Sequence, residues 1–168
     1  DGKCLNDYLH SGAHIYNDVF DVLTRFRLGK HAFTTDITKM FLQISVPERD
    51  QKYLRFLWKR PGDKHIRAFT FPVHAFGKCD SPIVAVAVAR HHITGDSLVS
   101  PMAQFAVTKQ SVVDDILFSS DNEDDTRECY LELVRSFKRC QMVLHKTRSN
   151  FPLADASNDG SFTIAKHY

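Results

Sequence analysis

The sequence predicts an α+β fold in which an antiparallel sheet, carrying a hairpin with two adjacent aspartates, packs on two or three helices. The segment Ser111–Phe118 supports the sheet, because it sets Asp114 and Asp115 between apolar residues typical of the two arms of a hairpin. Residues 13–28 and 121–141 support the helices, because their apolar side chains recur at helical spacing. With 168 residues and 43% hydrophobic content, the chain is long enough to bury one core between these layers.

An amphipathic helix and four strands are expected in the first half of the chain. The helix covers residues 13–28, and Gly29 is a natural stop after it. Residues 61–64, Pro-Gly-Asp-Lys, are a strong turn signal that pairs the strands on its two sides as a hairpin. The expected strands are His31–Asp36, which ends on a carboxylate, Leu42–Val46, Tyr53–Lys59 and Ile66–Phe71.

The second half is expected to contain two helices and the aspartate hairpin. Ser81 and Pro82 are typical of a helix start, where the hydroxyl caps the first turn and proline fits into it. The next residues, Ile83–Ala89, alternate like a strand, but their alanines favour a buried helix, which we adopt. The other expected elements are a loop at residues 94–103, a helix that starts in the acidic residues 121–125 and continues to Gln141, and an edge strand at Leu144–Thr147.

Composition limits the classes of protein that fit this chain. A net charge of +2 does not by itself indicate a nucleic-acid-binding protein, although basic clusters flank an acidic block at Asp114–Glu128. No run of about 18 apolar residues is present, which excludes a membrane-spanning helix. The four cysteines lack C-x-x-C spacing and favour free thiols in a reducing compartment. The chain opens at Asp1 without a methionine, which suggests a segment of a longer protein.

Asp114 and Asp115 repel each other unless positive charge lies beside them. A divalent cation provides that charge, but a solvated Asp-Asp turn is a common alternative. Asp36, at the end of the first predicted strand, adds a third carboxylate. Strand-end and hairpin carboxylates together suit a site for two divalent cations about 3.5–4 Å apart. Magnesium fits such a site, because it prefers oxygen ligands and keeps several waters.

The motifs along the chain resemble, in kind and in order, those of the palm region of a reverse transcriptase. The similarity is greatest to the Bel/Pao class of long-terminal-repeat retrotransposons, in which this enzyme is part of a polyprotein. The resemblance covers residues 1–150, and residues 151–168 form a polar tail with no recognisable match. The motifs are the lead-in segments Leu5–Leu9 and Leu23–Arg27, the first catalytic motif Thr35–Phe41, the F-G-x-x-x-S-P motif Phe76–Pro82, the Asp-Asp motif Val112–Asp115, and His145–Asn150 after the next helix.

The resemblance implies a polymerase palm-like sheet and RNA-directed DNA polymerase activity, in which deoxynucleotides are added to a primer 3′-hydroxyl by a two-metal mechanism. The implied cofactor is Mg²⁺, as two ions, with Mn²⁺ as a substitute. Asp36, Asp114 and Asp115 would be both the catalytic residues and the metal ligands. The implied substrate-binding residues are Phe41, Phe76, Gly77 and Lys146.

Each substrate-binding residue also has an ordinary structural explanation. Phe41 would lie under the incoming sugar and exclude a 2′-hydroxyl, or it would be a core phenylalanine. Phe76 would line the nucleotide pocket or pack its own loop, and Gly77 would let the backbone approach nucleotide and template or be a loop glycine. Lys146 would donate a proton to the departing pyrophosphate, or it would be a solvated surface lysine.

The resemblance also implies partners and a location. The partners would be an RNA or DNA template with its primer, deoxynucleoside triphosphates, and the rest of the polyprotein with its fingers, thumb and RNase H; no membrane is implied. The implied location is cytoplasmic, with virus-like particles and access to the nucleus as further options.

Several departures from the family pattern keep alternatives open. Val112 stands where the family usually has tyrosine, the basic finger residues would precede Asp1, and no thumb is recognisable after Asn150. One alternative is that the chain is a catalytically silent remnant that acts as a nucleic-acid-binding or interaction module. A structural α/β domain with a solvated Asp-Asp turn is a third hypothesis. Even as a polymerase fragment the isolated chain should be poorly active, because fingers and thumb position the substrates.

Overall fold

The computed structural model describes residues 2–153, and the chain divides into two compact units. The first unit is Asp1–Ala13 with Lys39–Ala85, and the second is His14–Thr38 with Val86–Tyr168. One division falls directly after a strand and another falls inside a helix. Neither point carries a proline- or glycine-rich linker in the sequence, so the sequence gives no sign of two units.

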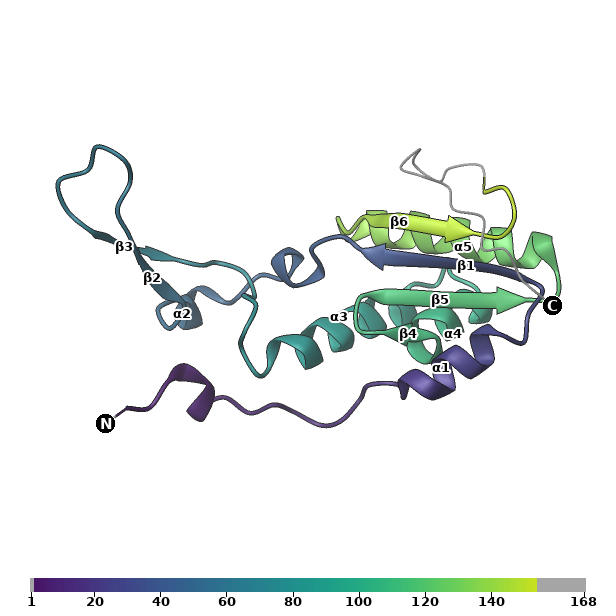
Figure 1. Cartoon of the computed structure of the whole chain (residues 1–168), viewed down its shortest axis with the longest axis horizontal. Helices are drawn as coiled ribbons and strands as arrows, with labels where there is room; N and C mark the ends of the chain where they lie inside the picture. The colour runs from purple at the N-terminus through teal and green to yellow at the C-terminus, as the bar shows by residue number, and fades with distance from the viewer. Residues whose placement is uncertain (1, 154–168) are drawn as a thin grey trace. The chain divides into compact units, whose positions relative to one another are not determined.

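The second unit is built on a four-stranded antiparallel sheet with the strand order β4–β5–β1–β6 (Figure 1). Helices α4 and α5 pack against this sheet, and α1 lies next to β4 and β5. The elements of the unit are α1 (Val19–Phe26), β1 (His31–Ile37), the larger part of α3 (Ser81–Gly95), α4 (Pro101–Lys109), β4 (Ser111–Val112), β5 (Asp115–Ser120), α5 (Glu123–Arg139) and β6 (Leu144–Ser149).

Alternating side chains give this sheet a helix-covered face and an open face. Phe33 and Ile37 of β1 and Phe118 of β5 are buried in the core. The Phe33 ring lies against the rings of Phe118 and of Tyr130 in α5, at centroid distances of 5.7 and 5.4 Å. Because neighbouring residues of a strand point to opposite faces, Asp36 lies on the open face, between buried residues on either side.

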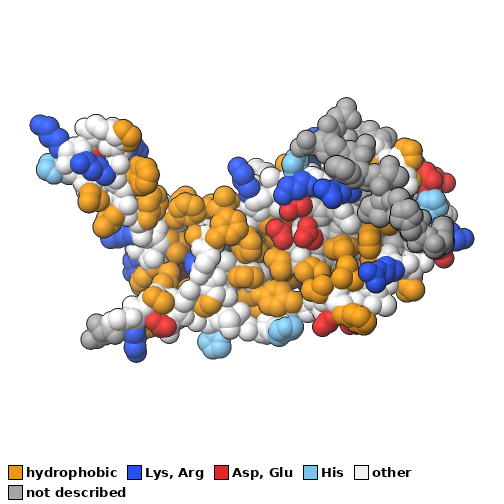
Figure 2. Space-filling model, viewed as in Figure 1, with side chains coloured by type: hydrophobic (Ala, Val, Ile, Leu, Met, Phe, Trp, Pro, Cys, Tyr) orange, Lys and Arg blue, Asp and Glu red, His pale blue; other side chains and the backbone are white. Residues whose placement is uncertain are grey.

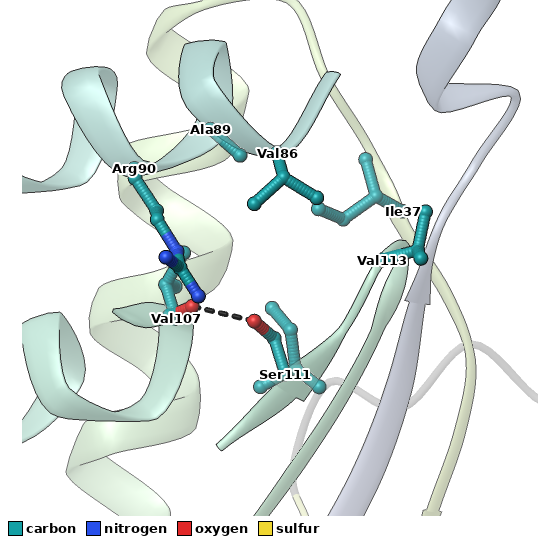
Figure 3. Close-up of a pocket in the computed structure, with 8 residues that line it drawn as sticks. Ile37, Val86, Ala89, Arg90, Val107, Ser111 and Val113 are labelled. Carbon is teal, nitrogen blue, oxygen red and sulfur yellow. Dashed lines mark hydrogen bonds between the residues drawn. The ribbon is translucent and has the colours of Figure 1, made fainter. Parts of the chain in front are cut away.

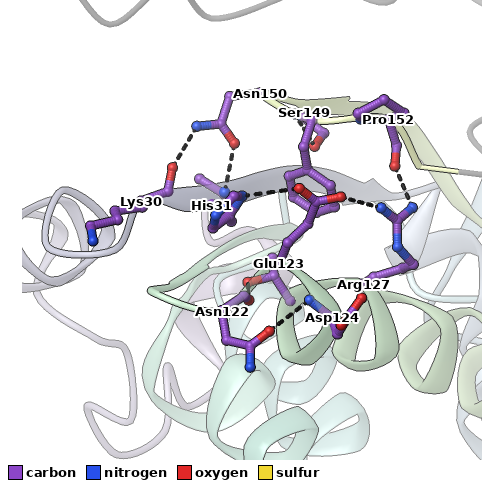
Figure 4. Close-up of polar contacts among 12 residues, drawn as sticks. Lys30, His31, Asn122, Glu123, Asp124, Arg127, Ser149, Asn150 and Pro152 are labelled. Atoms are coloured by element: carbon purple, nitrogen blue, oxygen red, sulfur yellow. Dashed lines mark hydrogen bonds and ion pairs between the residues drawn. The ribbon is translucent and has the colours of Figure 1, made fainter.

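Polar contacts fasten the end of β6 to the start of β1 (Figure 4). The Asn150 side chain accepts a hydrogen bond from the backbone N–H of Ala32 and donates one to the carbonyl of Lys30, both at 2.8 Å. Glu123, in the first turn of α5, lies 3.6 Å from the His31 ring. The edge strand is therefore held in place by side chains as well as by the ladder.

The first unit consists of short elements around a small core. Met40, Ile44 and Val46 are buried there. The N-terminal segment is attached through Asn6, whose side chain donates to the carbonyl of Gly77 at 2.8 Å and accepts from the N–H of Cys79 at 3.0 Å. The elements are the 3₁₀ helices η1 (Leu5–Asp7) and η2 (Met40–Gln43), α2 (Glu48–Gln51), and the two-stranded antiparallel sheet of β2 (Arg55–Trp58) and β3 (Arg67–Thr70), with the start of α3.

Most of the predicted elements are confirmed. The fold is α+β, with antiparallel sheets packed on helices. The hairpin on the two sides of residues 61–64, the helix from Ser81, the Asp-Asp hairpin, the acidic-start helix and the edge strand β6 are all present. The four cysteines are free thiols. Within residues 2–153, no helix combines the length and the apolar character needed to cross a membrane. Of the tail predicted at residues 151–168, the structure describes residues 151–153, in which Phe151 is buried, and the rest lies outside the described residues.

The strand predicted at Leu42–Val46 is wrong. A 3₁₀ helix takes its first half, and Ser45 forms only an isolated bridge with Val73. Ile44 and Val46 are nevertheless buried while Ser45 is exposed. The alternation in the sequence therefore reports alternating burial and not pairing in a ladder.

Two helix boundaries also differ from the prediction. Helix α1 begins at Val19 and not near residue 13, because the Asp18 side chain caps it by accepting from the N–H groups of Phe20 and Asp21. The loop predicted at residues 94–103 is wrong at its end, where α4 starts at Pro101. Ser100 caps α4, so the Ser-Pro pair that predicted α3 is repeated here and went unused.

Candidate active site

Two aspartates face each other on the open face of the four-stranded sheet. Asp36 of β1 is the register partner of Asp115 of β5. The next residue on each strand, Ile37 or Ile116, is buried. Figure 2 shows acidic side chains beside basic ones over this end of β1. Like charges directly opposite each other destabilise an antiparallel pair. The arrangement is therefore expected to attract positive charge.

The turn that joins β4 to β5 holds Val113, the residue before Asp114, under backbone strain. Val113 has a φ of 55°, in the left-handed region that is sterically costly for a β-branched residue. The carbonyl of Asp114 accepts a hydrogen bond of 2.9 Å from the N–H of Ile37, which ties the turn to the end of β1. Strained conformations persist where the surrounding structure determines them, and they concentrate at functional sites.

An apolar wall supports this turn from behind (Figure 3). Ser111, at the start of β4, donates its hydroxyl hydrogen bond to the carbonyl of Val107 in α4 at 2.6 Å. This bond fixes the hairpin to the helix layer. The wall is lined by Ile37, Val86, Ala89, Arg90, Val107, Ser111, Val113 and Ile116, and the space among them is too small to hold a water molecule.

Arg90 is the polar member of this wall. Its Nη1 donates to the carbonyl of Ile15 at 2.6 Å, while Nε and Nη2 are buried and find no hydrogen-bond partner within the described residues. Burial lowers the pKa of this guanidinium. Since no ligand fits the space, we interpret Arg90 as a structural group that fastens the segment before α1 to α3.

A β-bulge interrupts β6 beside the two aspartates. Thr34 of β1 pairs with Arg148, whereas Asp36 pairs with His145. Two residues of β6 therefore stand opposite Thr35 alone, which is the pattern of a bulge. Bulges often redirect a side chain next to an active site.

The bulge sends its two side chains to opposite faces. The Thr147 hydroxyl lies 2.9 Å from that of Thr35 and 3.2 Å from that of Tyr130, on the helix-covered face. Lys146 has a φ of 52° and directs its ammonium to the open face, where Nζ lies 3.9 Å from Oδ2 of Asp36. The extra residue thus brings a cation to the carboxylate pair.

The open face forms a polar cleft of about 350 Å³ at this point. Partial burial, together with the negative charges of Asp114 and Asp36, raises the pKa of Asp115, and the charge of Lys146 acts in the opposite direction. The three carboxylates therefore lie close enough to influence one another. The cleft is lined by Thr34, Thr35, Asp36, Asp115, Lys146 and Arg148.

The carboxylates of this site can supply some, but not all, of the ligands of a magnesium ion. Among the residues that the structure describes, no three His, Cys, Asp or Glu side chains converge as a ready-made metal site. Asp36 and Asp115 supply carboxylate oxygens from adjacent strands, with Asp114 next to them. Magnesium commonly binds through one or two carboxylates, with waters and substrate phosphates completing its shell. The pair thus fits a cation that arrives with a phosphate substrate.

Three of the predicted site residues belong to the first unit. The rings of Phe41 and Phe76 lie against each other with centroids 5.1 Å apart. Gly77 has a φ of 87° and open space around its α-carbon, so glycine is required there by conformation. Their positions relative to the carboxylates stay a prediction.

Two features of the site were not predicted from the sequence. Arg148 lines the cleft. It follows Lys146 by two residues, and this spacing in the sequence could have indicated that the two side chains share one face of the strand. The strain at Val113 had no signal, because valine is among the last residues expected at a positive φ.

No protein-family model and no curated protein matches this chain. Solved structures of foamy virus protease-reverse transcriptase do. The complex with an RNA/DNA hybrid is 18% identical over 80% of this chain, with a TM-score of 0.58, and the complex with double-stranded DNA is 15% identical over 86%, with a TM-score of 0.64. A native prototype foamy virus enzyme is 15% identical over 83%, with a TM-score of 0.60.

These comparisons establish a reverse transcriptase-like fold. The matched part is 17% of the chain bound to the RNA/DNA hybrid and 27% of the chain bound to double-stranded DNA. Identities of 15–18% show the fold alone and do not carry an activity over to this chain.

Proposed function

We propose that this chain is the fingers and palm segment of an RNA-directed DNA polymerase from a Bel/Pao-type long-terminal-repeat retrotransposon. The observation that carries the proposal is the cross-strand pair of Asp36 and Asp115, with Asp114 in a strained turn beside it and Lys146 at 3.9 Å from Asp36. The reverse transcriptase-like fold supports it. The Bel/Pao assignment is supported by the sequence motifs.

The reaction proposed for this site is nucleotidyl transfer. The primer 3′-hydroxyl attacks the α-phosphorus of a deoxynucleoside triphosphate, a new P–O bond forms, and the bond to the β-phosphate oxygen breaks to release pyrophosphate. When bound by Asp36, Asp114 and Asp115, magnesium would supply charge stabilisation for both the attacking and the leaving oxygen. The primer hydroxyl gives its proton to a solvent water in this step, and the leaving pyrophosphate takes up another.

The chain's own groups would position and protonate the substrates. Lys146 is a suitable donor of the proton that pyrophosphate takes up as it leaves, because it stands at the rim of the cleft with 70% of its side chain exposed. Arg148, in the same cleft, adds a second cation for phosphate oxygens. Phe41 and Phe76 are proposed to shape the sugar pocket.

The test is templated primer extension by the full gene product that contains this chain, with Asp36→Asn and Asp114→Asn as variants. Each change should reduce extension by at least about 10³-fold, because the variant loses one ligand charge for the metals. Asp121→Asn, at an exposed carboxylate beyond the end of β5, is the matched control and should extend normally. Equal extension by Asp114→Asn and the wild type would overturn the metal-ligand assignment.

A specific observation keeps a second function in view. Val112 occupies the position where the family usually has tyrosine, and no ready three-ligand metal cluster is present within residues 2–153. A catalytically silent module that binds nucleic acid would have both features. Titration of Mn²⁺, followed by its electron paramagnetic resonance signal, separates the two functions. Binding that is lost in Asp36→Asn supports the polymerase, whereas template-primer binding without Mn²⁺ binding supports the silent module.

A further inference from the structure

The first unit contains a pocket that the proposed polymerase chemistry does not use. Its volume is about 350 Å³, which lies within the range of small-molecule sites in proteins. All of its lining residues belong to the first unit. We call this space the first-unit pocket, and its apolar walls are formed by Leu5, Leu9, Val46, Pro47, Tyr53 and Leu54.

Hydrogen bonds hold the walls of the first-unit pocket in place. The N-terminal segment is attached through the Asn6 side chain, which accepts from the N–H of Cys79 at 3.0 Å. The thiol of Cys79 in turn donates to the carbonyl of Leu9 at 3.6 Å. The side-chain amide of Gln51 donates to the carbonyl of Val46 at 2.8 Å. The pocket is therefore built into the folded unit.

Three polar side chains meet in the lining of this pocket. The ammonium of Lys78 lies 3.3 Å from Oδ2 of Asp80 and 3.4 Å from Nδ1 of His74. His74 is buried, and only 11% of the Lys78 side chain is exposed. Burial, and then the charge of Lys78, lower the pKa of His74 below its ordinary value of 6.5, although Asp80 acts in the opposite direction. The ring is therefore neutral at pH 7, and its Nδ1 accepts from the ammonium.

One atom of this polar group lacks a partner. Oδ1 of Asp80 is buried, and no donor within the described residues reaches it. A buried acceptor without a hydrogen bond destabilises the fold, so such atoms call for a donor from a bound molecule. A single water molecule would satisfy Oδ1 but would leave the apolar walls in contact with solvent. A ligand that carries both a donor and an apolar body satisfies both parts of the pocket.

The lining also has an excess of negative charge. Asp50 lines the pocket with 48% of its side chain exposed, and its pairing with the exposed Arg49, at 3.5 Å, is screened by solvent. With His74 neutral, the two carboxylates of Asp50 and Asp80 against the one ammonium of Lys78 leave a net charge of −1. This balance favours a cation, whereas an anion would meet two carboxylates.

We propose that the first-unit pocket binds a small organic cation. The apolar ring or chain of the ligand lies against the walls, and its primary ammonium group donates to Oδ1 of Asp80, with Asp50 as a second negative charge nearby. Apolar walls with a few convergent polar groups are typical of small-molecule sites. The inference goes beyond the polymerase proposal, because it uses neither the carboxylate pair of β1 and β5 nor the proposed sugar pocket.

Three probes of similar size separate charge from apolar contact: 2-phenylethylammonium, 2-phenylethanol and 3-phenylpropionate. The 168-residue chain, labelled with carbon-13 at its leucine and valine methyl groups, is titrated with each probe and followed by NMR. The cation should shift the methyl signals of Leu5, Leu9, Val46 and Leu54. The signals of Val107, which is buried in the second unit, should stay in place.

The order of affinities decides between the possible ligands. The cation should bind at least about 10-fold more tightly than the alcohol, because its hydrogen bond to the carboxylate is charge-assisted, and 3-phenylpropionate should bind most weakly. Equal affinity for the cation and the alcohol would show apolar contact alone, and tighter binding of 3-phenylpropionate would show an anion site at Lys78. Either result, or the absence of shifts with all three probes, would overturn the inference.

Variants then assign the contact. Asp80→Asn should weaken binding of the cation about 10-fold and leave binding of the alcohol unchanged. Because this change also removes the counter-ion of Lys78, Asp50→Asn provides a second test at a half-exposed residue and should weaken the cation about 3-fold. Glu48→Gln, at an exposed residue of the same helix outside the pocket lining, is the matched control and should bind normally. Unchanged affinity in both aspartate variants would contradict the assignment.

A last arm separates this inference from the polymerase proposal. The carboxylates of β1 and β5 also attract cations, so the double variant Asp36→Asn, Asp115→Asn is titrated with 2-phenylethylammonium. It should bind the probe as the wild type does, even if primer extension fails. Loss of binding in this variant would place the cation at the carboxylate site and would overturn the inference while leaving the polymerase proposal intact.

Discussion

Asp115 shows how the site is shaped at the scale of single residues. Its carboxylate stands opposite that of Asp36 and next to that of Asp114, while Lys146 brings positive charge to the group. Ionisation of Asp115 therefore costs folding free energy until a cation is bound. Strain at Val113 adds to this cost. The site is unfavourable for the metal-free fold, which is typical of residues kept for chemistry.

Asp115→Asn should raise the thermal stability of the metal-free chain at pH 7. The folded state raises the pKa of Asp115 above its ordinary value of 3.8. The folded chain therefore holds this proton to higher pH than the unfolded chain does, and stability falls as the pH rises through the raised pKa. Thermal unfolding in EDTA should give a higher Tm for the variant at pH 7 and no difference near pH 3. Each 1 kcal/mol gained in the free energy of unfolding should raise the Tm by about 2–4 °C.

The control for this prediction is Asp121→Asn, at an exposed carboxylate outside the site. Its Tm should match that of the wild type across the same pH range. A lower Tm for Asp115→Asn at pH 7 would show that the carboxylate stabilises the fold, contrary to the repulsion argued above.

At the scale of elements, each functional side chain depends on an irregularity or a cap. The bulge in β6 brings Lys146 to Asp36, while the fastening of Asn150 to the start of β1 keeps the strand in register. Helix α5 covers the back of the sheet with Tyr130, Leu133 and Phe137. The Asn122 cap determines where this helix begins.

Lys146→Gly in the full gene product should slow primer extension without destabilising the fold. Glycine adopts the φ of 52° at this position freely, so the bulge is kept while the cation is lost. A general acid typically contributes at least about 10²-fold, and we expect a loss of that size in the rate of single-nucleotide addition. Lys146→Arg separates charge from proton donation, because it keeps the cation but holds its proton too tightly to donate it. Full activity in Lys146→Gly would exclude both roles.

Asn122→Ala should destabilise the chain by about 1 kcal/mol, as expected for the loss of a helix N-cap. The Asn122 side chain accepts from the backbone N–H groups of Asp124 and Asp125, at 2.8 and 3.4 Å (Figure 4). Urea unfolding monitored by circular dichroism measures the change. Asn122→Asp keeps the acceptor and should retain the wild-type stability; an equal loss in both variants would show that the cap is not the cause.

At the scale of the whole molecule, links between distant segments decide which elements share a unit. In the second unit, Asp96 after α3 accepts hydrogen bonds from Arg139 and from Ser136 of α5, the latter at 2.7 Å. His92 joins the same group through Ser136, at 3.1 Å. The carboxylate contacts the serine and not the histidine, and Ser136 is fully buried, so this cluster is structural and is not a hydrolase triad.

Asp96→Asn should destabilise the chain at pH 7 and lose this effect in acid. The hydrogen bonds from Arg139 and Ser136 lower the pKa of Asp96 from 3.8 to about 2. The stability that the carboxylate contributes is therefore complete above pH 3.8 and disappears as the pH falls through about 2. Chemical unfolding of both chains at pH 7, 4 and 2 should show the difference shrink. Glu128→Gln, in an exposed pair with Arg135, should have little effect at any pH.

The sequence was sufficient for the elements with strong local signals. The Ser81-Pro82 start, the turn at residues 61–64 and the acidic first turn of α5 act through neighbouring residues, so each could be recognised without tertiary structure. The strand at Leu42–Val46 failed because alternating burial does not reveal whether a partner strand exists. The fold prediction was confirmed at the level of the reverse transcriptase-like fold, and the assigned roles of the site residues stay predictions.

The chemistry that the chain can offer is readable in its sequence: three carboxylates and a lysine follow the order of a known family, on elements with local signals. How these groups meet depends on the folded chain. The ladder register places Asp36 opposite Asp115, and a bulge with a left-handed residue turns Lys146 toward them. The physical reason is that register and bulges are set by pairing between segments about a hundred residues apart, which no local pattern encodes.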